Sequence, residues 1–77
     1  MAKLPLAFAE YLYETMTKAN EGDKQALSFF AKMYEEGLHD CQRDLKEALK
    51  WYRKLALQGD RSAQRKVKEI EIQLMFQ

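Results

Sequence analysis

The stretch Ala19-Asn20-Glu21-Gly22-Asp23-Lys24-Gln25-Ala26 returns 37 residues later as Ala56-Leu57-Gln58-Gly59-Asp60-Arg61-Ser62-Ala63. Alanine, glycine, aspartate, a basic residue and alanine recur at matching places. A period between about 20 and 50 residues is typical of stacked repeats, in which one unit needs a neighbour to bury its apolar face. The repetition therefore predicts a repeat architecture, of a kind that usually binds partners rather than transforming them.

Around these two stretches, apolar residues at helical spacing predict four helices and almost no strand. We expect helices over about residues 4–19, 24–36, 45–56 and from about 61 onward. Gly22, Gly37 and Gly59 break them, and Asp23 and Asp44 are placed to cap the helices that follow. Short connections make neighbouring helices antiparallel. The expected fold is all-α, with about four antiparallel helices forming two stacked helical hairpins.

Each predicted helix has one apolar face, which we expect to be buried. The members of these faces are Leu4, Phe8, Tyr11, Leu12, Thr15, Met16 and Ala19, then Ala26, Phe30 and Met33, then Leu45, Ala48, Leu49, Tyr52, Leu55 and Ala56, and finally Ala63, Val67, Ile70 and Leu74. Phe29, Tyr34 and Trp51 flank them. Base stacking is the alternative role for the aromatic residues, but their helical spacing favours packing.

Length and composition restrict the class of protein. Seventy-seven residues make a single domain, 1–77, near the lower size at which one core suffices. The lone Cys41 excludes an internal disulfide, and no apolar run approaches the roughly 20 residues that span a bilayer. Residues 1–16 also lack the unbroken apolar core of a signal peptide. We therefore expect a soluble cytoplasmic protein with no membrane contact.

The formal charge of +1 conceals an uneven distribution. Residues 42–68 contain nine basic and three acidic side chains, a balance of +6, whereas residues 1–41 have a balance of −3. Such a chain could steer an acidic partner toward its C-terminal half. A basic stripe on the third helix consists of Lys46, Lys50, Arg53 and Lys54. This stripe is either a solvated face or a docking face for an acidic protein or nucleic acid.

Two runs of residues resemble a known family. They are Ala26-x3-Phe30-Ala31-x-Met33-Tyr34-x2-Gly37 and Asp44-x3-Ala48-x2-Trp51-Tyr52-x2-Leu55-Ala56-x2-Gly59. Together they resemble the Sel-like repeat family, a relative of the tetratricopeptide repeats, with one full repeat at about 22–59 and half-repeats on each side. Ala31 stands where that family prefers glycine, and the 38–41 loop lacks its usual Gly-Val. The single cysteine means that the disulfide-bound character of some members does not transfer.

The resemblance implies a protein-binding surface. In helical-hairpin repeats the first helix of each pair lines the concave side, which here would be the second and fourth helices. The corresponding polar strip is Gln25, Ser28, Lys32, Glu35, Ser62, Arg65 and Glu69. A second candidate is the apolar group Ile72, Met75 and Phe76, which would make a homodimer contact through the C-terminal helix or fit a partner groove. Its alternative is to fold back over the first hairpin.

The offset of 37 residues also bears on where the stack ends. It maps Phe29 to Lys66 and Tyr34 to Glu71, so the face expected to meet a further repeat becomes charged. A charged outer face is typical of a terminal capping helix. This favours a complete small protein over a piece of a longer array.

Chemistry-bearing motifs are scarce. His39-Asp40-Cys41 is the only cluster that resembles catalytic parts, and it lacks a second base and oxyanion donors. One histidine and one cysteine have no paired metal-ligand spacing, so we expect no catalytic residues, metal or cofactor. Cys41 is expected to pack as a small apolar group.

We therefore expect a non-enzymatic protein–protein interaction module. It would act as a small adaptor, or as an inhibitor that occludes a larger partner, in the manner of phage- or plasmid-borne antagonists. The alternative is a nucleic-acid-associated protein that uses the basic stripe of the third helix.

Overall fold

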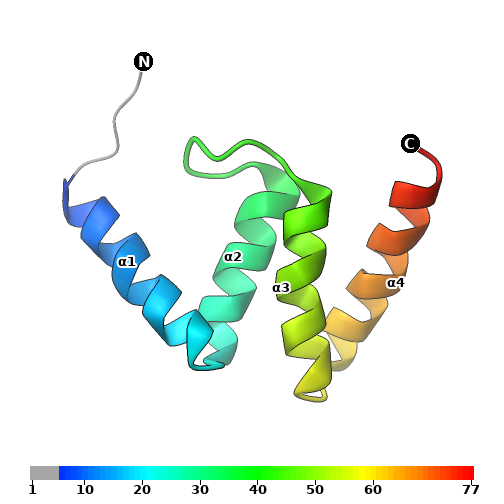
Figure 1. Cartoon of the computed structure of the whole chain (residues 1–77), viewed down its shortest axis with the longest axis horizontal. Coiled ribbons are helices and arrows are strands. Elements are labelled where there is room, and N and C mark those ends of the chain that lie inside the picture. The colour runs from blue at the N-terminus through cyan, green and yellow to red at the C-terminus, as the bar shows by residue number, and fades with distance from the viewer. Residues whose placement is uncertain (1–5) are drawn as a thin grey trace.

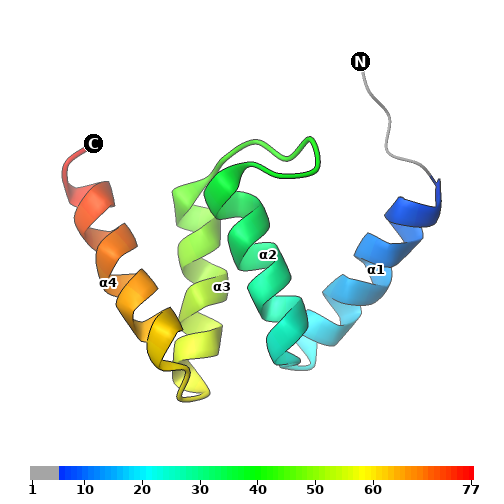
Figure 2. The ribbon, with the colours of Figure 1, turned by 180° about the vertical axis from the view of Figure 1, so that it is seen from behind.

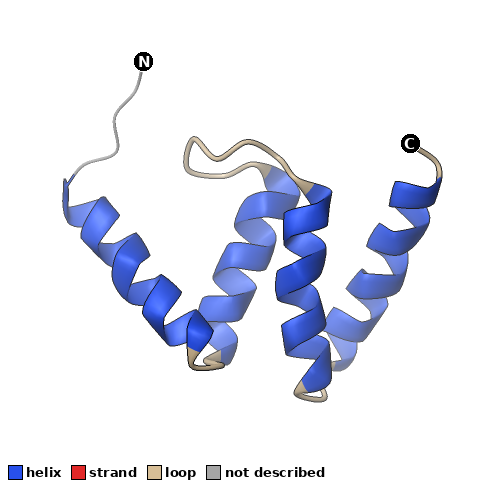
Figure 3. Ribbon diagram, viewed as in Figure 1, coloured by secondary structure: helices blue, strands red, loops and turns tan. Residues whose placement is uncertain are grey.

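Four α-helices build the molecule. The computed structural model describes residues 6–77, with α1 (Leu6–Asn20), α2 (Lys24–Glu36), α3 (Leu45–Leu57) and α4 (Arg61–Met75). The helices lie in a row, and each runs antiparallel to its neighbour in the chain (Figure 1). Residues 6–77 contain no strand (Figure 3). The predicted all-α fold of antiparallel hairpins is confirmed. The predicted helix start at Leu4 falls outside the described residues.

The first repeated stretch forms a compact turn between α1 and α2. Gly22 has a φ of +90°, which favours glycine, and its N–H donates to Ala19 O at 3.0 Å. The Asp23 N–H donates to Lys18 O at 3.0 Å. The Asp23 carboxylate accepts a hydrogen bond from the Ala26 N–H at 3.0 Å. Asp23 thus closes the end of one helix and caps the start of the next.

The second repeated stretch forms the same turn between α3 and α4. Gly59 also has a φ of +90°, and its N–H donates to Ala56 O at 3.0 Å. The Asp60 N–H donates to Leu55 O, and the Asp60 carboxylate caps the Ala63 N–H at 2.8 Å. The recurring glycine and aspartate therefore supply the conformation and the cap that this turn requires, whereas the alanines contribute backbone atoms.

The two turns touch one another. The side-chain Nε2 of Gln58, just before the second turn, donates to Gly22 O in the first turn at 2.7 Å. Both turns lie along the lower edge of the molecule in Figure 1, and the α2–α3 connection lies along the upper edge. The rear view preserves this order, with α1 and α4 at the outer edges (Figure 2).

A longer loop joins α2 to α3. Gly37 ends α2 in the left-handed conformation at φ +70°, as predicted, and its N–H donates to Met33 O at 2.8 Å. At the far end of the loop, the Asp44 carboxylate caps α3 by accepting from the N–H groups of Lys46 and Glu47. The Asp44 N–H donates to Tyr34 O at 2.8 Å and ties the loop to α2.

The core lies where α2, α3 and α4 pack together. Its buried apolar members are Ala19, Ala26, Leu27, Phe30, Ala31, Met33, Leu45, Ala48, Leu49, Trp51, Tyr52, Leu55, Ala63 and Ile70. The predicted faces of the last three helices are therefore buried, with Ala56, Val67 and Leu74 partly covered at the margin. In α1 only Thr15 and Ala19 are buried, and Tyr11 is 49% exposed. The first helix is thus the least covered of the four.

The structure decides between the two alternatives for the end of α4 and shows what its charged residues contact. The C-terminal residues do not fold back over the first hairpin, because α4 packs against α3 and makes no close backbone contact with α1 in the described chain. Lys66 and Glu71 both form ion pairs with preceding helices, Lys66 with Glu35 of α2 at 2.7 Å and Glu71 with Arg53 of α3 at 2.8 Å.

Candidate functional site

An open groove runs between α2 and α4, with Tyr52 of α3 on its floor. It consists of two adjoining hollows of about 560 Å³ and 170 Å³, which share Lys32, Tyr52 and Lys66. The remaining lining residues are Ser28, Glu35, Glu36, Arg43, Leu55, Asp60, Ser62 and Ala63. We call this surface the α2–α4 groove. It combines residues from three helices of the described chain.

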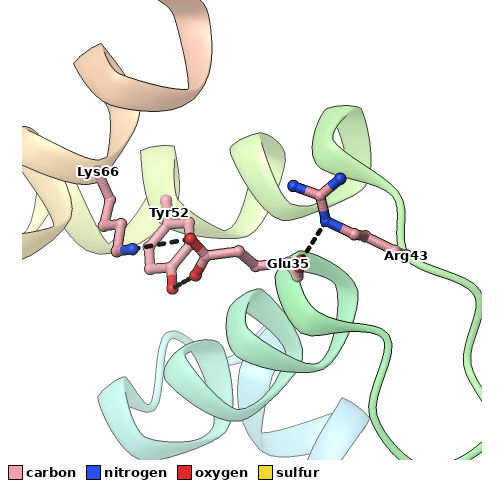
Figure 4. A network of polar contacts seen from close by, with 4 residues as sticks. All are labelled: Glu35, Arg43, Tyr52 and Lys66. Carbon is pink, nitrogen blue, oxygen red and sulfur yellow. Dashed lines mark hydrogen bonds and ion pairs between the residues drawn. The ribbon is translucent and has the colours of Figure 1, made fainter. Parts of the chain in front are cut away.

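A polar network holds the walls of the groove in place (Figure 4). The Glu35 carboxylate accepts hydrogen bonds from Lys66 Nζ and from the Tyr52 hydroxyl, each at 2.7 Å. Arg43 Nε donates to the backbone O of Glu35 at 3.0 Å. Glu35 therefore links α2 to α3, to α4 and to the end of the α2–α3 loop.

The network changes the pKa values of Glu35, Tyr52 and Lys66. Partial burial on its own would raise the pKa of Glu35, but the hydrogen bonds from Lys66 and Tyr52 outweigh it and hold that pKa below its ordinary value. Burial, followed by the bond to Glu35, raises the pKa of the Tyr52 hydroxyl. The bond to Glu35 raises the pKa of Lys66. At neutral pH the groove therefore contains a charged carboxylate–ammonium pair and a neutral phenol.

Two cationic groups in the groove keep donors available. Lys32 makes no ion pair within residues 6–77, and Arg43 uses only its Nε in the network. Lys32 and Arg43 line the larger hollow together. An arginine fork and an ammonium group at one site can hold a carboxylate of a partner.

The predicted concave strip is divided by the structure. Ser28, Lys32, Glu35 and Ser62 line the α2–α4 groove. Gln25 lies in a separate hollow between α1 and α2, beside Tyr11. Arg65 lines a hollow on the outer side of α4, and Glu69 is exposed outside these hollows.

The three partners of Glu35 in the polar network are not among the site residues predicted from the sequence. Tyr52 was assigned to the core, where its ring is buried, but its hydroxyl reaches Glu35. The sequence places Lys66 on an outward face and Arg43 in the loop after α2. A useful signal is that Lys66 stands at the position equivalent to Phe29, which is partly buried, because a partly buried lysine needs a nearby acid.

The predicted basic stripe of α3 is partly occupied by neighbouring side chains. Lys50 pairs with Glu47 at 3.5 Å, and Arg53 pairs with Glu71. The ammonium groups of Lys50 and Lys54 lie 5.2 Å and 4.9 Å from the centre of the Trp51 ring. Lys46 lies apart, in a small hollow with Leu74 and Gln77. The four charges do not form one uninterrupted cationic face.

The predicted apolar group at the end of α4 is on the surface. Ile72, Met75 and Phe76 are 55%, 76% and 82% exposed. The aromatic residues, in contrast, pack as predicted, since Phe30 stacks on Trp51 at 5.2 Å and Phe29 meets Phe30 edge to face.

The structure shows the surroundings of two residues in the His39-Asp40-Cys41 loop. The His39 ring lies against Phe8 and Phe29, with centroids 4.8 Å and 5.7 Å away. Burial raises the pKa of the Cys41 thiol, and the charges of Asp44 and Glu47 raise it further, which disfavours the reactive thiolate. Within residues 6–77 no group of three histidine, cysteine or acidic side chains is placed to hold a metal ion.

Comparison with known proteins yields no further assignment. No family model matches the chain, and neither a curated protein nor a solved structure matches it. None of the helices in residues 6–77 is both long enough and apolar enough to cross a membrane.

Proposed function

We propose that this chain is a non-enzymatic protein-interaction module that binds an acidic segment of a partner protein in the α2–α4 groove. The observation that carries the proposal is the juxtaposition of Lys32 and Arg43, both with free donors, beside the Glu35–Tyr52–Lys66 network. The network preorganises the groove, so little ordering entropy is lost when a partner binds. The groove is open along its length, which suits a segment of polypeptide.

The duplicated turns and hairpins support the further proposal that the chain is a Sel-like repeat domain. In that setting it would act as a small adaptor, or as an inhibitor when the acidic segment belongs to the partner's working surface. A reducing compartment such as the cytoplasm fits the single thiol of Cys41, whose raised pKa disfavours disulfide exchange.

A nucleic-acid partner on the α3 stripe has less support. Glu47 and Glu71 pair with Lys50 and Arg53, so two of the four positive charges are compensated within the chain. Retention on DNA or RNA at low salt that is lost in Lys50→Glu, Arg53→Glu protein would favour this alternative.

The groove proposal is tested by comparative capture from the native host. Tagged wild-type protein and the double variant Lys32→Glu, Arg43→Glu are used as baits, and bound proteins are identified by mass spectrometry. We expect one or more proteins with acidic segments to bind the wild type and to be lost with the variant.

The matched control is Lys24→Glu, Lys46→Glu, which makes the same change in charge at two exposed positions outside the groove. It should retain the captured proteins. Equal capture by all three baits, or loss with the control as well, would contradict binding in the α2–α4 groove.

A further inference from the structure

The outer side of α4 presents one exposed stripe with two different halves. Arg61, Gln64, Arg65 and Lys68 line a hollow of about 420 Å³ in its first half, and Ile72 and Met75 continue the stripe toward the C-terminus. Arg61, Arg65 and Lys68 make no ion pair within residues 6–77. We call these six residues the α4 outer stripe. It is cationic at one end and apolar at the other.

The repeat offset explains why this stripe is open. Gln64 and Lys68 stand 37 residues after Leu27 and Ala31, which are both 0% exposed. Leu27 and Ala31 share the side of α2 that carries Phe30, whose ring stacks on Trp51 of α3. At Gln64 and Lys68 the α4 outer stripe is therefore the counterpart of the α2 face that α3 covers. In residues 6–77 no helix covers it on α4.

An exposed stripe on α1 has the complementary character. Leu6, Glu10, Tyr13, Glu14 and Thr17 are exposed and follow one another at helical spacing. Glu10 and Glu14 make no ion pair within the described chain. We call these residues the α1 outer stripe. It is acidic toward its middle, with an exposed leucine at its beginning.

At Glu14 the α1 outer stripe is likewise the counterpart of a covered position. Glu14 stands 37 residues before Trp51, the α3 residue that stacks on α2. The opposite side of α1 is occupied, because Tyr11, Thr15 and Lys18 line the hollow shared with α2. In the 37-residue repeat α1 corresponds to α3, but in residues 6–77 no helix lies on the side of α1 that corresponds to the α3 side facing α2. Likewise α4 corresponds to α2, but no helix lies on the side of α4 that corresponds to the α2 side facing α3.

We propose that α1 of a second copy of this chain packs antiparallel on the α4 outer stripe, in the position that α3 takes on α2. The register follows from the contact between Phe30 and Trp51. Val67 stands 37 residues after Phe30, and Glu14 stands 37 residues before Trp51, so Val67 of one copy should lie beside Glu14 of the other. Glu14 then lies next to Lys68, one turn from Arg65. At the other end of the same antiparallel pair, Leu6 meets Met75.

This contact joins unlike surfaces, so it is head to tail rather than two-fold symmetric. Each copy would use its α4 outer stripe toward one neighbour and its α1 outer stripe toward another, giving either a ring or an open chain. We expected self-association through the C-terminal helix, and the proposed contact adds that this helix binds the α1 outer stripe of the second copy. It does not involve the α2–α4 groove, so either proposal can fail alone.

The experiment is sedimentation velocity over a range of protein and salt concentrations with a charge-swapped pair. Wild-type protein should associate as its concentration rises, and salt should weaken the association. Lys68→Glu and Glu14→Lys should each weaken it by about tenfold, because an attraction becomes a repulsion. An equimolar mixture of the two variants should recover the association, since every contact in an alternating chain is then between opposite charges.

The control is Lys46→Glu, which makes the same charge change at an exposed position outside the α4 outer stripe and should associate like the wild type. All substituted side chains are exposed, and unchanged helical circular dichroism would verify their folds. A wild type that stays monomeric up to millimolar concentration overturns the proposal. So does a mixture that associates no better than its components. Stronger association of Lys68→Glu alone would indicate an α4–α4 contact and would also overturn it.

Discussion

The first hairpin, α1–α2, and the second, α3–α4, are joined by the same turn but are packed differently. In both, a glycine at φ +90° is followed by an aspartate that caps the next helix. Yet α3 buries Leu45, Ala48, Leu49, Trp51, Tyr52 and Leu55, whereas α1 buries only Thr15 and Ala19. The turn sequence thus fixes the direction in which the chain reverses, while the flanking side chains decide how tightly two helices associate.

Equivalent positions show how the difference arises. Tyr52 corresponds to Thr15, and Lys66 corresponds to Phe29. In the second hairpin Tyr52 and Lys66 converge on Glu35 of α2. In the first, the Thr15 hydroxyl bonds only within its own helix, to Tyr11 O at 2.6 Å. The polar links therefore join the second hairpin to α2 and leave α1 outside the network.

The largest expected difference between the repeats is at Leu27 and its equivalent, Gln64. Leu27→Ala should lower the free energy of unfolding by about 2–5 kcal/mol, because it leaves a cavity in a fully buried site. Gln64→Ala should change it by no more than about 0.5 kcal/mol, since Gln64 is exposed. Urea denaturation measures both. Similar losses at the two sites would contradict the conclusion that Leu27 is covered by neighbouring helices and Gln64 is not.

The losses of stability caused by Gly→Ala substitution in the two turns should differ by a smaller amount. Gly22→Ala and Gly59→Ala should each cost about 1–2 kcal/mol, because a side chain disfavours a positive φ. Gly22→Ala should be the more harmful, since its added Cβ would lie 3.3 Å from Gln58 Nε2, whereas that of Gly59 would meet no atom within 4 Å. Thermal and urea unfolding of both variants test the order. A more harmful Gly59→Ala would show that the turns are not coupled as described.

Substitutions at Tyr52 and at Thr15 should differ in how their effect on stability depends on pH. The pKa of Glu35 is lowered from 4.5 in the folded state, so the stability contributed by its charged form is present above pH 4.5 and is lost as pH falls through the lower folded pKa. Tyr52→Phe should cost about 1 kcal/mol at neutral pH by removing one bond to that carboxylate. The cost should shrink in acid.

Thr15→Val is the matched control, because its hydroxyl contacts no titrating group. Its effect, measured by urea denaturation over the same pH series, should be independent of pH. A Tyr52→Phe cost that stays constant between pH 3 and pH 7 would contradict the role given to Glu35.

The smallest effect is expected at Gln58, which links the turns. Gln58→Ala should cost about 0.5 kcal/mol, because its bond to Gly22 O is exposed to solvent. In the Gln58→Ala background, Gly22→Ala and Gly59→Ala should have closer costs than in the wild type, since the contact at 3.3 Å is gone. A double-mutant cycle measures this coupling. Strict additivity would contradict it.

The features that could be predicted from the sequence are those set by near neighbours. Asp23 and Asp44 cap helices as expected, Gly37 ends α2, and the apolar spacing of α2 and α3 identifies their buried faces. These properties depend on residues within about four positions. They sufficed for the all-α hairpin fold.

The candidate site was harder to predict because it depends on distant residues. Lys66 and Glu35 are 31 positions apart, and their pairing follows from how three helices pack. Similarly, nothing in the spacing of Ile72, Met75 and Phe76 distinguished exposure from folding back over α1. Four of the seven strip residues line the groove because α2 and α4 lie on either side of α3, a consequence of the repeat rather than of local pattern.

The sparse burial of α1 has a consequence for how the molecule unfolds. A helix with two buried residues can open at a small free-energy cost while the α2–α3–α4 body stays folded. The backbone amides of α1 should then exchange with solvent hydrogen much faster than those of α3, in a gradient along the chain. The helix α1 would then unfold separately from the α2–α3–α4 body. Cooperative unfolding would include only the part of the molecule that follows the turn between α1 and α2.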